Sequence, residues 1–389
     1  MKKMLSMLLA TLMVLSLLAG CGSNTNAPAT TDTPAAADTT DTTASGEAAA
    51  VEPFTGSNVF EAVEWAQRNF PDATVIRYAN QTSSANFEAN GGSIAAACLY
   101  LAKELPIRTE GRYRLEVYAD GILASSVDDI VGGLKEGTFE MNCLTAGSWS
   151  SYTDAFAEIN VPFLFSSCEH AEAVLEAGLL DEMYVRAEAD VPGVLFRGIN
   201  AIGFRELTNN KKEITTPADV SGLKLRTLSD PIQIAAWEAL GASVVSVPYS
   251  DLYSSLQQGM IDGEENPALN LWNEKLYEVQ KYMTMTNHLF TLSCQIVSKD
   301  FYDSMSAEDQ QILEELIAEA QVASFDRYKE MSEEAVAHLE DAGMIITYLD
   351  DAQLQAFKDA MAPAYDMCIE TMGQERWDAL QNYLTANAG

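Results

Sequence analysis

Short extended segments alternate with amphipathic helical segments along most of this sequence, and this alternation limits the fold more than any other feature. Ile94, Cys98 and Leu101, for example, recur at the spacing of one helix face. We expect strands at residues 75–79, 115–119, 139–144, 198–202, 223–227, 244–247 and 292–298. Strands that alternate with helices predict an α/β fold. A helix of roughly thirty residues is expected after Ser306, and this length is more than one small domain needs. The length of the whole chain, 389 residues, suggests two domains.

The N-terminus has the pattern of an export signal. Lys2 and Lys3 precede an apolar run at 4–18, which is shorter than the roughly 20 residues that a membrane-spanning helix needs. Small residues follow the run directly before Cys21, so we interpret residues 1–20 as a signal peptide. The cysteine makes this site resemble a bacterial lipobox, which implies lipidation of Cys21. The alternative is an ordinary signal peptide followed by a fortuitous cysteine.

Residues 21–56 are expected to be a tether. Between 23 and 50 the chain is almost entirely Ser, Asn, Thr, Ala, Pro, Asp and Gly, with no aromatic residue. Such a segment cannot bury enough apolar surface to offset the entropy lost on ordering. A lipid, a tether and a folded body together predict a protein held outside the cytoplasm, either anchored at the outer face of the cell membrane or in a periplasm.

The composition excludes some classes of partner. The chain has 57 acidic and 23 basic residues and a formal charge of −34, whereas nucleic-acid binding needs a concentrated basic surface. The sequence shows no metal-binding, cofactor-binding or catalytic motif, so we expect no metal, no cofactor and no enzyme activity. An odd number of cysteines after Cys21 favours buried thiols over a disulfide framework. These cysteines are Cys98, Cys143, Cys168, Cys294 and Cys368.

A series of spaced motifs occupies residues 203–288. They read GFRELTN at 203–209, TPADVSGLKLRT at 216–227, VPYSDLY at 247–253, QGMIDGEENP at 258–267, LYEVQKY at 276–282 and TNH at 286–288. In this order they resemble the solute-binding subunits of tripartite ATP-independent periplasmic (TRAP) transporters, a family similar to dicarboxylate-binding proteins. The resemblance extends from about residue 75 to the C-terminus.

The resemblance implies both a fold and a site. The fold would be a two-lobed α/β periplasmic-binding-protein fold, similar to class II, with a ligand cleft between the lobes and a long helix bracing both. Lobe one would comprise 74–202 plus 291–330, and lobe two 203–290 plus 331–389. Arg226 would grip the ligand carboxylate, with Arg205 as a second arginine near that group. The other residues implied at the site are Asn266 and the aromatic Tyr249.

The residues around Arg226 favour this role independently of the resemblance. The two-residue period of a strand at 223–227 puts Arg226 near the strand's end, just before a helix N-terminus at Asp230-Pro231. In open α/β sheets, ligands bind at the carboxyl ends of strands, where helix N-termini favour anions. A guanidinium also matches a carboxylate with two parallel hydrogen bonds. The alternative is that Arg226 pairs with an acidic side chain of the protein itself.

Loops of the first lobe are expected to contact the rest of the ligand. Loops 80–86 and 145–149 follow predicted strands and are rich in amides and hydroxyls, although such loops are often plain turns. The expected contacts are Gln81, Asn86, Thr145, Trp149 and Phe165. Amides and hydroxyls would suit a hydroxylated acid such as a sugar acid; a dicarboxylate is the other class considered. Some members of the family carry a charged residue near the position of Thr145, which this chain lacks.

The sequence thus predicts a solute-binding protein that captures a small organic acid and delivers it to a TRAP-type membrane permease, without chemistry of its own. Two alternatives stay open. A sensory or adhesion module on the same scaffold would pass a ligand signal to a receptor, and a secreted enzyme would turn its ligand over.

Overall fold

The computed structural model describes residues 51–387. The predicted signal peptide, Cys21 and most of the predicted tether lie outside the described residues. Residues 51–56 have no regular secondary structure, but they contact the first helix. The indole Nε1 of Trp65 donates a 2.7 Å hydrogen bond to the carbonyl of Glu52, and the ring of Phe54 packs edge-on against Trp65. Within the described range, no helix has both the length and the apolar character that a membrane span requires.

One mixed sheet joins the strands of the described part of the chain. Its order is β2-β1-β3-β9-β4-β7-β5-β6, with β8 beside β4 and β10 beside β8. The strands are β1 (Thr74–Ala79), β2 (Tyr113–Tyr118), β3 (Met141–Thr145), β4 (Val194–Asn209), β5 (Lys224–Arg226), β6 (Ser243–Val245), β7 (Gly263–Pro267), β8 (Tyr282–Met285), β9 (Phe290–Ser298) and β10 (Ile345–Tyr348). β1 is parallel to β2 and β3, and β5 is parallel to β6 and β7, whereas β4 is antiparallel to β9, β7 and β8.

Strand β4 changes its partner part-way along its length. Residues 194–204 pair with β9, and the next residues, from Arg205 to Asn209, pair with β7. The register slips between Ala201 and Gly203, where Gly203 has a φ of +123°. A Cβ at this glycine would collide with the ring of Tyr328, so both the backbone angle and the close approach require glycine. β4 therefore extends well beyond the predicted strand at 198–202 and belongs to both halves of the sheet.

Helices cover the sheet, and several of them begin directly after a capping side chain. The carboxylate of Asp230 accepts a 2.7 Å hydrogen bond from the amide of Ile232, so α7 begins at Pro231 as predicted. The helices are α1 (Val59–Asn69), α2 (Ser84–Ala89), α3 (Ser93–Arg108), α4 (Val127–Glu136), α5 (Cys168–Val174), α6 (Leu180–Asp190), α7 (Pro231–Ala239), α8 (Leu252–Gln257), α9 (Ala268–Asn273), α10 (Lys299–Ser304), α11 (Ala307–Asp341), α12 (Asp351–Ala360), α13 (Ala362–Met372) and α14 (Gln374–Ala386).

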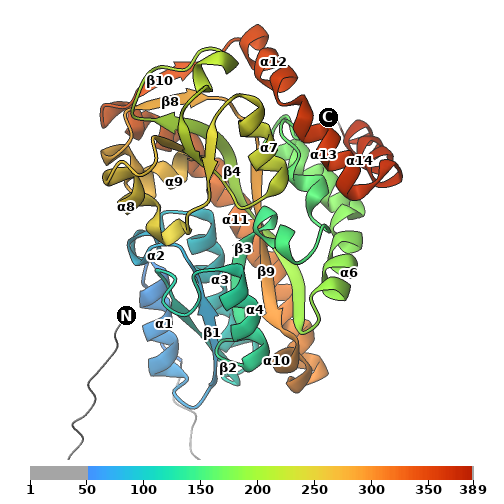
Figure 1. Ribbon diagram of the computed structural model, residues 1–389. Helices are drawn as coiled ribbons and strands as arrows, with labels where there is room; N and C mark the ends of the chain where they lie inside the picture. Colours follow the sequence, from blue (N-terminus) through green and yellow to red (C-terminus); the bar gives the residue numbers. More distant parts are fainter. Residues whose placement is uncertain (1–50, 388–389) are drawn as a thin grey trace, which may run out of the picture. The chain divides into compact units, whose positions relative to one another are not determined.

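The long helix predicted after Ser306 is α11, which is 35 residues long and capped by the Ser306 hydroxyl. Leu316 and Ile317 belong to the hydrophobic core shared with α3 and β1. Further along, Ala335 and Leu339 belong to a separate core with α8 and α9. Figure 1 shows α11 and β9 running lengthwise through the molecule, from the β1–β2 end toward the end that carries β8 and β10. α11 therefore ties the two ends together.

The five cysteines of the folded body are buried, which confirms the prediction made from their number. Cys98, Cys294 and Cys368 are fully buried, and Cys143 and Cys168 are nearly so. Burial raises the pKa of the Cys143 thiol to about 11, so this group is not a thiolate at neutral pH.

Candidate ligand-binding site

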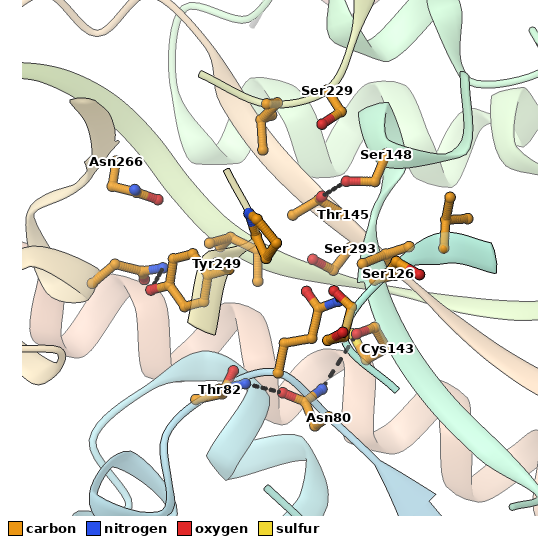
Figure 2. A pocket seen from close by; sticks show the side chains of 18 of the residues that line it. Asn80, Thr82, Ser126, Cys143, Thr145, Ser148, Ser229, Tyr249, Asn266 and Ser293 are labelled. Atoms are coloured by element: carbon orange, nitrogen blue, oxygen red, sulfur yellow. Dashed lines mark hydrogen bonds between the residues drawn. The ribbon is translucent and has the colours of Figure 1, made fainter. Parts of the chain in front are cut away.

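A cavity of about 320 Å³ lies where the two halves of the sheet meet. Its walls come from the ends of β1, β3 and β5, from the middle of β4 and β9, and from the loop after β6. Figure 2 shows Asn266 and Tyr249 on one side of this space and Thr145, Ser148, Ser126 and Cys143 on the other. The cavity is within the size range of small-molecule sites, at its lower end.

Arg226 lines this cavity and is only 6% exposed. Its Nε and Nη2 each donate a 3.1 Å hydrogen bond to the carbonyl of Val247. The third nitrogen, Nη1, is buried and has no hydrogen-bond partner in the described part of the chain. No carboxylate of residues 51–387 lies within ion-pair distance of this guanidinium. Burial, followed by the neighbouring Arg205 charge, lowers the pKa of Arg226. The cavity thus contains a buried positive charge that the described protein leaves without a counterion.

Arg205 also lines the cavity, but its charge is compensated. Its Nε and Nη2 donate to the carboxylate of Glu265, which is completely buried, and Nη1 lies 3.4 Å from the hydroxyl of Thr291. The same carboxylate accepts a 2.6 Å hydrogen bond from Thr227 and faces Nε2 of His288 at 3.1 Å. Although burial alone would raise it, Arg205 and His288 lower the pKa of Glu265 to about 2. The Arg205–Glu265 pair is therefore an ion pair at neutral pH.

Asn266 and Tyr249 are positioned by their own polar neighbours. The side-chain amide of Asn266 donates to Glu264, whose carboxylate also accepts a 2.8 Å hydrogen bond from Thr208. The hydroxyl of Tyr249 accepts a 3.2 Å hydrogen bond from the amide of Asn270 (Figure 2). Since Asn270 also lines the cavity, this bond fixes two cavity side chains relative to each other.

The opposite wall is uncharged, and its hydroxyls and amides lie among the apolar side chains of Ile94, Val127 and Leu144. The hydroxyls of Thr145 and Ser148 lie 2.6 Å apart, and the amide of Asn80 donates to the carbonyl of Cys143 at 3.3 Å, as Figure 2 shows. The hydroxyl of Ser293 on β9 is buried and has no hydrogen-bond partner within residues 51–387. The uncharged polar residues around the whole cavity are Asn80, Gln81, Thr82, Ser125, Ser126, Thr145, Ser148, Ser229, Ser246, Tyr249, Asn266, Asn270 and Ser293.

The structure brings six of the residues singled out from sequence to this cavity: Arg205, Arg226, Asn266, Tyr249, Gln81 and Thr145. It does not bring the other three there. Trp149 is fully buried and packs edge-on against Phe196. Phe165 lies in the same hydrophobic core, against Phe290. Asn86 lines a small neighbouring pocket, where its amide lies 3.5 Å from the Glu274 carboxylate.

Sequence reasoning missed Ser293 and Ser126, which the cavity brings together with Asn80 of the expected loop 80–86. The signal for Ser293 is visible in the strand itself. Thr291, Ser293 and Gln295 alternate with apolar residues along a strand that is buried on both faces. A polar face on such a strand indicates that it borders a polar interior space.

Comparison with known proteins shows that the chain is similar to bacterial solute-binding proteins. A family model described as bacterial extracellular solute-binding protein, family 7, matches residues 85–371. The 2,3-diketo-L-gulonate-binding periplasmic protein of Escherichia coli is 30% identical over 69% of this chain and 80% of its own length. A solute-binding protein of Verminephrobacter eiseniae is 30% identical over 67% of this chain and 77% of its own length.

Solved structures show the same fold. A TRAP periplasmic solute-binding protein from Bordetella, with density interpreted as pantoate, superimposes with a TM-score of 0.73 at 26% identity and covers 80% of this chain and 98% of its own. One from Ochrobactrum anthropi, with its C-terminus bound in the ligand-binding pocket, has a TM-score of 0.69 at 31% identity and covers 81% and 95%. These likenesses confirm the predicted two-lobed α/β fold.

Proposed function

Because the chain belongs to family 7 of the bacterial extracellular solute-binding proteins, we propose that its cavity holds the carboxylate of a small organic acid on Arg226. The family makes this a TRAP-type solute-binding protein, as the motifs at 203–288 predicted. The carboxylate would sit against Arg226, with Arg205 and Asn266 beside it and Tyr249 as the neighbouring wall.

One observation carries the proposal: Nη1 of Arg226 is buried at the cavity and finds no partner among the residues that the structure describes. A buried guanidinium that lacks a carboxylate is costly, because the lost hydration is not replaced by an opposite charge. A ligand carboxylate would supply both the missing hydrogen bond and the missing counterion. No Asp or Glu side chain of the described residues lines the cavity, so none competes for this position.

The ligands named for two relatives are acids, which supports an acid as the ligand of this chain. The Escherichia coli relative is named for 2,3-diketo-L-gulonate, and the Bordetella structure contains density interpreted as pantoate. Both ligands carry a carboxylate, which makes the same chemistry reasonable for this chain.

We place the lobes at 74–202 plus 291–330 and at 203–290 plus 331–389. The support for this division is the change of β4 from β9 to β7 at residues 204–205 and the membership of α11 in two separate cores. The hinge would then consist of β4, β9 and α11. Gly203 would permit the bend, because it already has a positive φ.

Beyond the cavity, the proposal extends to the route of the ligand. Cys21 would carry the lipid anchor at the outer face of the cell membrane, and residues 22–50 would give the folded body reach. The bound acid would pass unchanged to TRAP-type integral membrane subunits. The cavity lining of the described residues contains hydroxyls and the thiol of Cys143, but no carboxylate or imidazole that could serve as a base.

A thermal-shift screen tests the proposal. Wild-type protein should be stabilised by one or more small carboxylates and by none of the corresponding neutral alcohols or amides, because ligand binding raises stability by RT ln(1 + [L]/Kd). The shift should vanish in Arg226→Ala. It should persist in Arg68→Ala, which removes an exposed arginine that pairs with Glu64 on α1. Stabilisation by acids that survives Arg226→Ala unchanged would contradict the proposal.

A further inference from the structure

Resting on the function proposed above, we infer that the ligand carries a single carboxylate and no other charge, and that the rest of it is a short hydroxylated carbon chain. The observation behind this inference is that Arg226, which has no carboxylate partner among the described residues, is opposed across the cavity by an uncharged wall that carries hydroxyls and amides among apolar side chains.

Ion pairing leaves one guanidinium of the cavity lining without a carboxylate partner among the described residues. Glu264, which accepts a hydrogen bond from Asn266, lies outside the lining, and burial raises its pKa to about 7. Among the described residues that line the cavity, Arg205 and Arg226 alone are charged. Glu265 neutralises Arg205 through a buried ion pair, and this carboxylate has Thr227 and His288 as further partners. Arg226 alone is left to neutralise a ligand. The site therefore balances one negative charge.

A second carboxylate on the ligand would lie against the opposite wall without a cation. The side chains there are those of Asn80, Ser126, Thr145, Ser148 and Ser293. Hydroxyls and amides replace part of the hydration of a carboxylate but not its counterion. The resulting loss of affinity is on the order of 100-fold or more. An ammonium group on the ligand would also lower the affinity, because no carboxylate of the described residues lines the cavity.

Hydroxyl groups on the ligand match the same wall. A ligand hydroxyl both donates and accepts, and so do the side chains of Thr145 and Ser148, which lie 2.6 Å apart. Ser293 offers a buried hydroxyl that has no partner among residues 51–387. An unsubstituted hydrocarbon chain would leave this hydroxyl unsatisfied, which is costly for a buried polar atom. With a cavity of about 320 Å³, the chain is a short one.

Calorimetry with a matched panel of probes tests the inference. The panel contains four- to six-carbon aldonates in their different stereochemistries, the corresponding aldarates with a carboxylate at each end, a 2-amino-2-deoxyaldonate, hexanoate and sorbitol. At least one aldonate should bind, its aldarate and its amino derivative should bind about 100-fold more weakly or worse, and hexanoate and sorbitol should not bind measurably.

A pair of variants adds a second readout. Thr145→Lys places a cation on the uncharged wall, so it should improve aldarate affinity relative to aldonate affinity by about tenfold or more. Thr145→Val removes the hydroxyl without adding charge, so it should leave that ratio unchanged while weakening both acids.

The outcomes separate this inference from the function it rests on. A dicarboxylate, an amino acid or hexanoate that binds wild type as tightly as the best aldonate, and loses binding in Arg226→Ala, would overturn the inference and leave the proposed function standing. If no acid of the panel binds while another small carboxylate stabilises the wild type in the thermal-shift screen, the inference fails and the proposed function stands. If the acids bind but Arg226→Ala leaves their affinity unchanged, both fail.

Discussion

Replacing Arg226 should separate the contribution of its charge from that of its geometry. In the structure, Nε and Nη2 are held by the carbonyl of Val247, and Nη1 has no partner among the described residues. This arrangement fixes the plane of the guanidinium before the ligand arrives. Arg226→Ala removes both the charge and the available donor, which leaves the ligand carboxylate buried without its partner. That situation costs roughly 3–5 kcal/mol, or a loss of affinity of about 100- to 5,000-fold.

Arg226→Lys should have an intermediate effect. It keeps the charge, but a single ammonium cannot hold Val247 and present a planar fork to the ligand at once. The loss of one charge-assisted hydrogen bond is worth about 1.5–3 kcal/mol, so the affinity should fall by about 10- to 100-fold.

Titration calorimetry on wild type, Arg226→Ala, Arg226→Lys and the surface control Arg68→Ala measures these effects with any acid found by screening. Thermal unfolding of each variant without added acid shows whether the fold is intact. We expect Arg226→Ala to change this stability by less than about 2 kcal/mol, because the lost bonds to Val247 are offset by the removal of a buried, unneutralised charge. Dissociation constants for both Arg226 variants within about threefold of the Arg68→Ala value would refute the assignment.

Three other perturbations test the framework around the site. Glu265→Gln leaves the buried Arg205 guanidinium without its counterion, so urea denaturation should show a loss of about 3–5 kcal/mol; a loss below about 1 kcal/mol would mean that the pair is not needed. Burial raises the pKa of Glu206 from 4.5 to about 8, so the native state binds more protons than the unfolded state between these values. Stability should therefore fall as the pH rises from 5 to 8, and Glu206→Gln should make that fall shallower in denaturation at the two pH values; an unchanged slope would contradict the shift. Gly203→Ala forces an alanine into a φ of +123° and its Cβ against the ring of Tyr328. The free energy of unfolding should fall by at least about 1 kcal/mol, and the melting temperature should fall with it. An unchanged melting temperature would exclude strain at this residue.

Much of the fold follows from local signals in the sequence. Helix α7 begins directly after Asp230, and α11 begins directly after Ser306. The side chains of these two residues accept hydrogen bonds from amides in the first turn, which have no partner within the helix. Most strands also lie within a few residues of the predicted ranges, since their apolar runs are bounded by polar turns.

Strand β4 shows where local signals end. The sequence predicts five residues of strand at 198–202, whereas the strand covers 16 residues. Two glycines and the charged residues Arg205 and Glu206 interrupt the apolar pattern. They are tolerated because Arg205 and Glu206 are satisfied by groups on other elements, namely Glu265 on β7 and the amide of Asn287. A local window of sequence cannot reveal such long-range partners.

The site residues also divide into those that a local sequence pattern predicts and those that it does not. Arg226 could be singled out because a strand end, a following helix and a guanidinium coincide within a few residues. The position of its loop after a strand predicts Trp149 near the ligand, yet its ring packs into the core against Phe196. The direction in which a loop side chain points depends on packing partners far away in the sequence. Ser293 was overlooked for the opposite reason, since a serine in an apolar strand attracts no attention unless its period-two polar neighbours are considered.

A crystal structure of the protein with its tightest-binding acid would show whether Arg226 holds the carboxylate of the ligand. We expect both lobes closed on the ligand, with a carboxylate oxygen within about 3 Å of Nη1 of Arg226. A complex in which Nη1 contacts a side chain of the protein, while the ligand's acid group lies elsewhere, would contradict this role of Arg226.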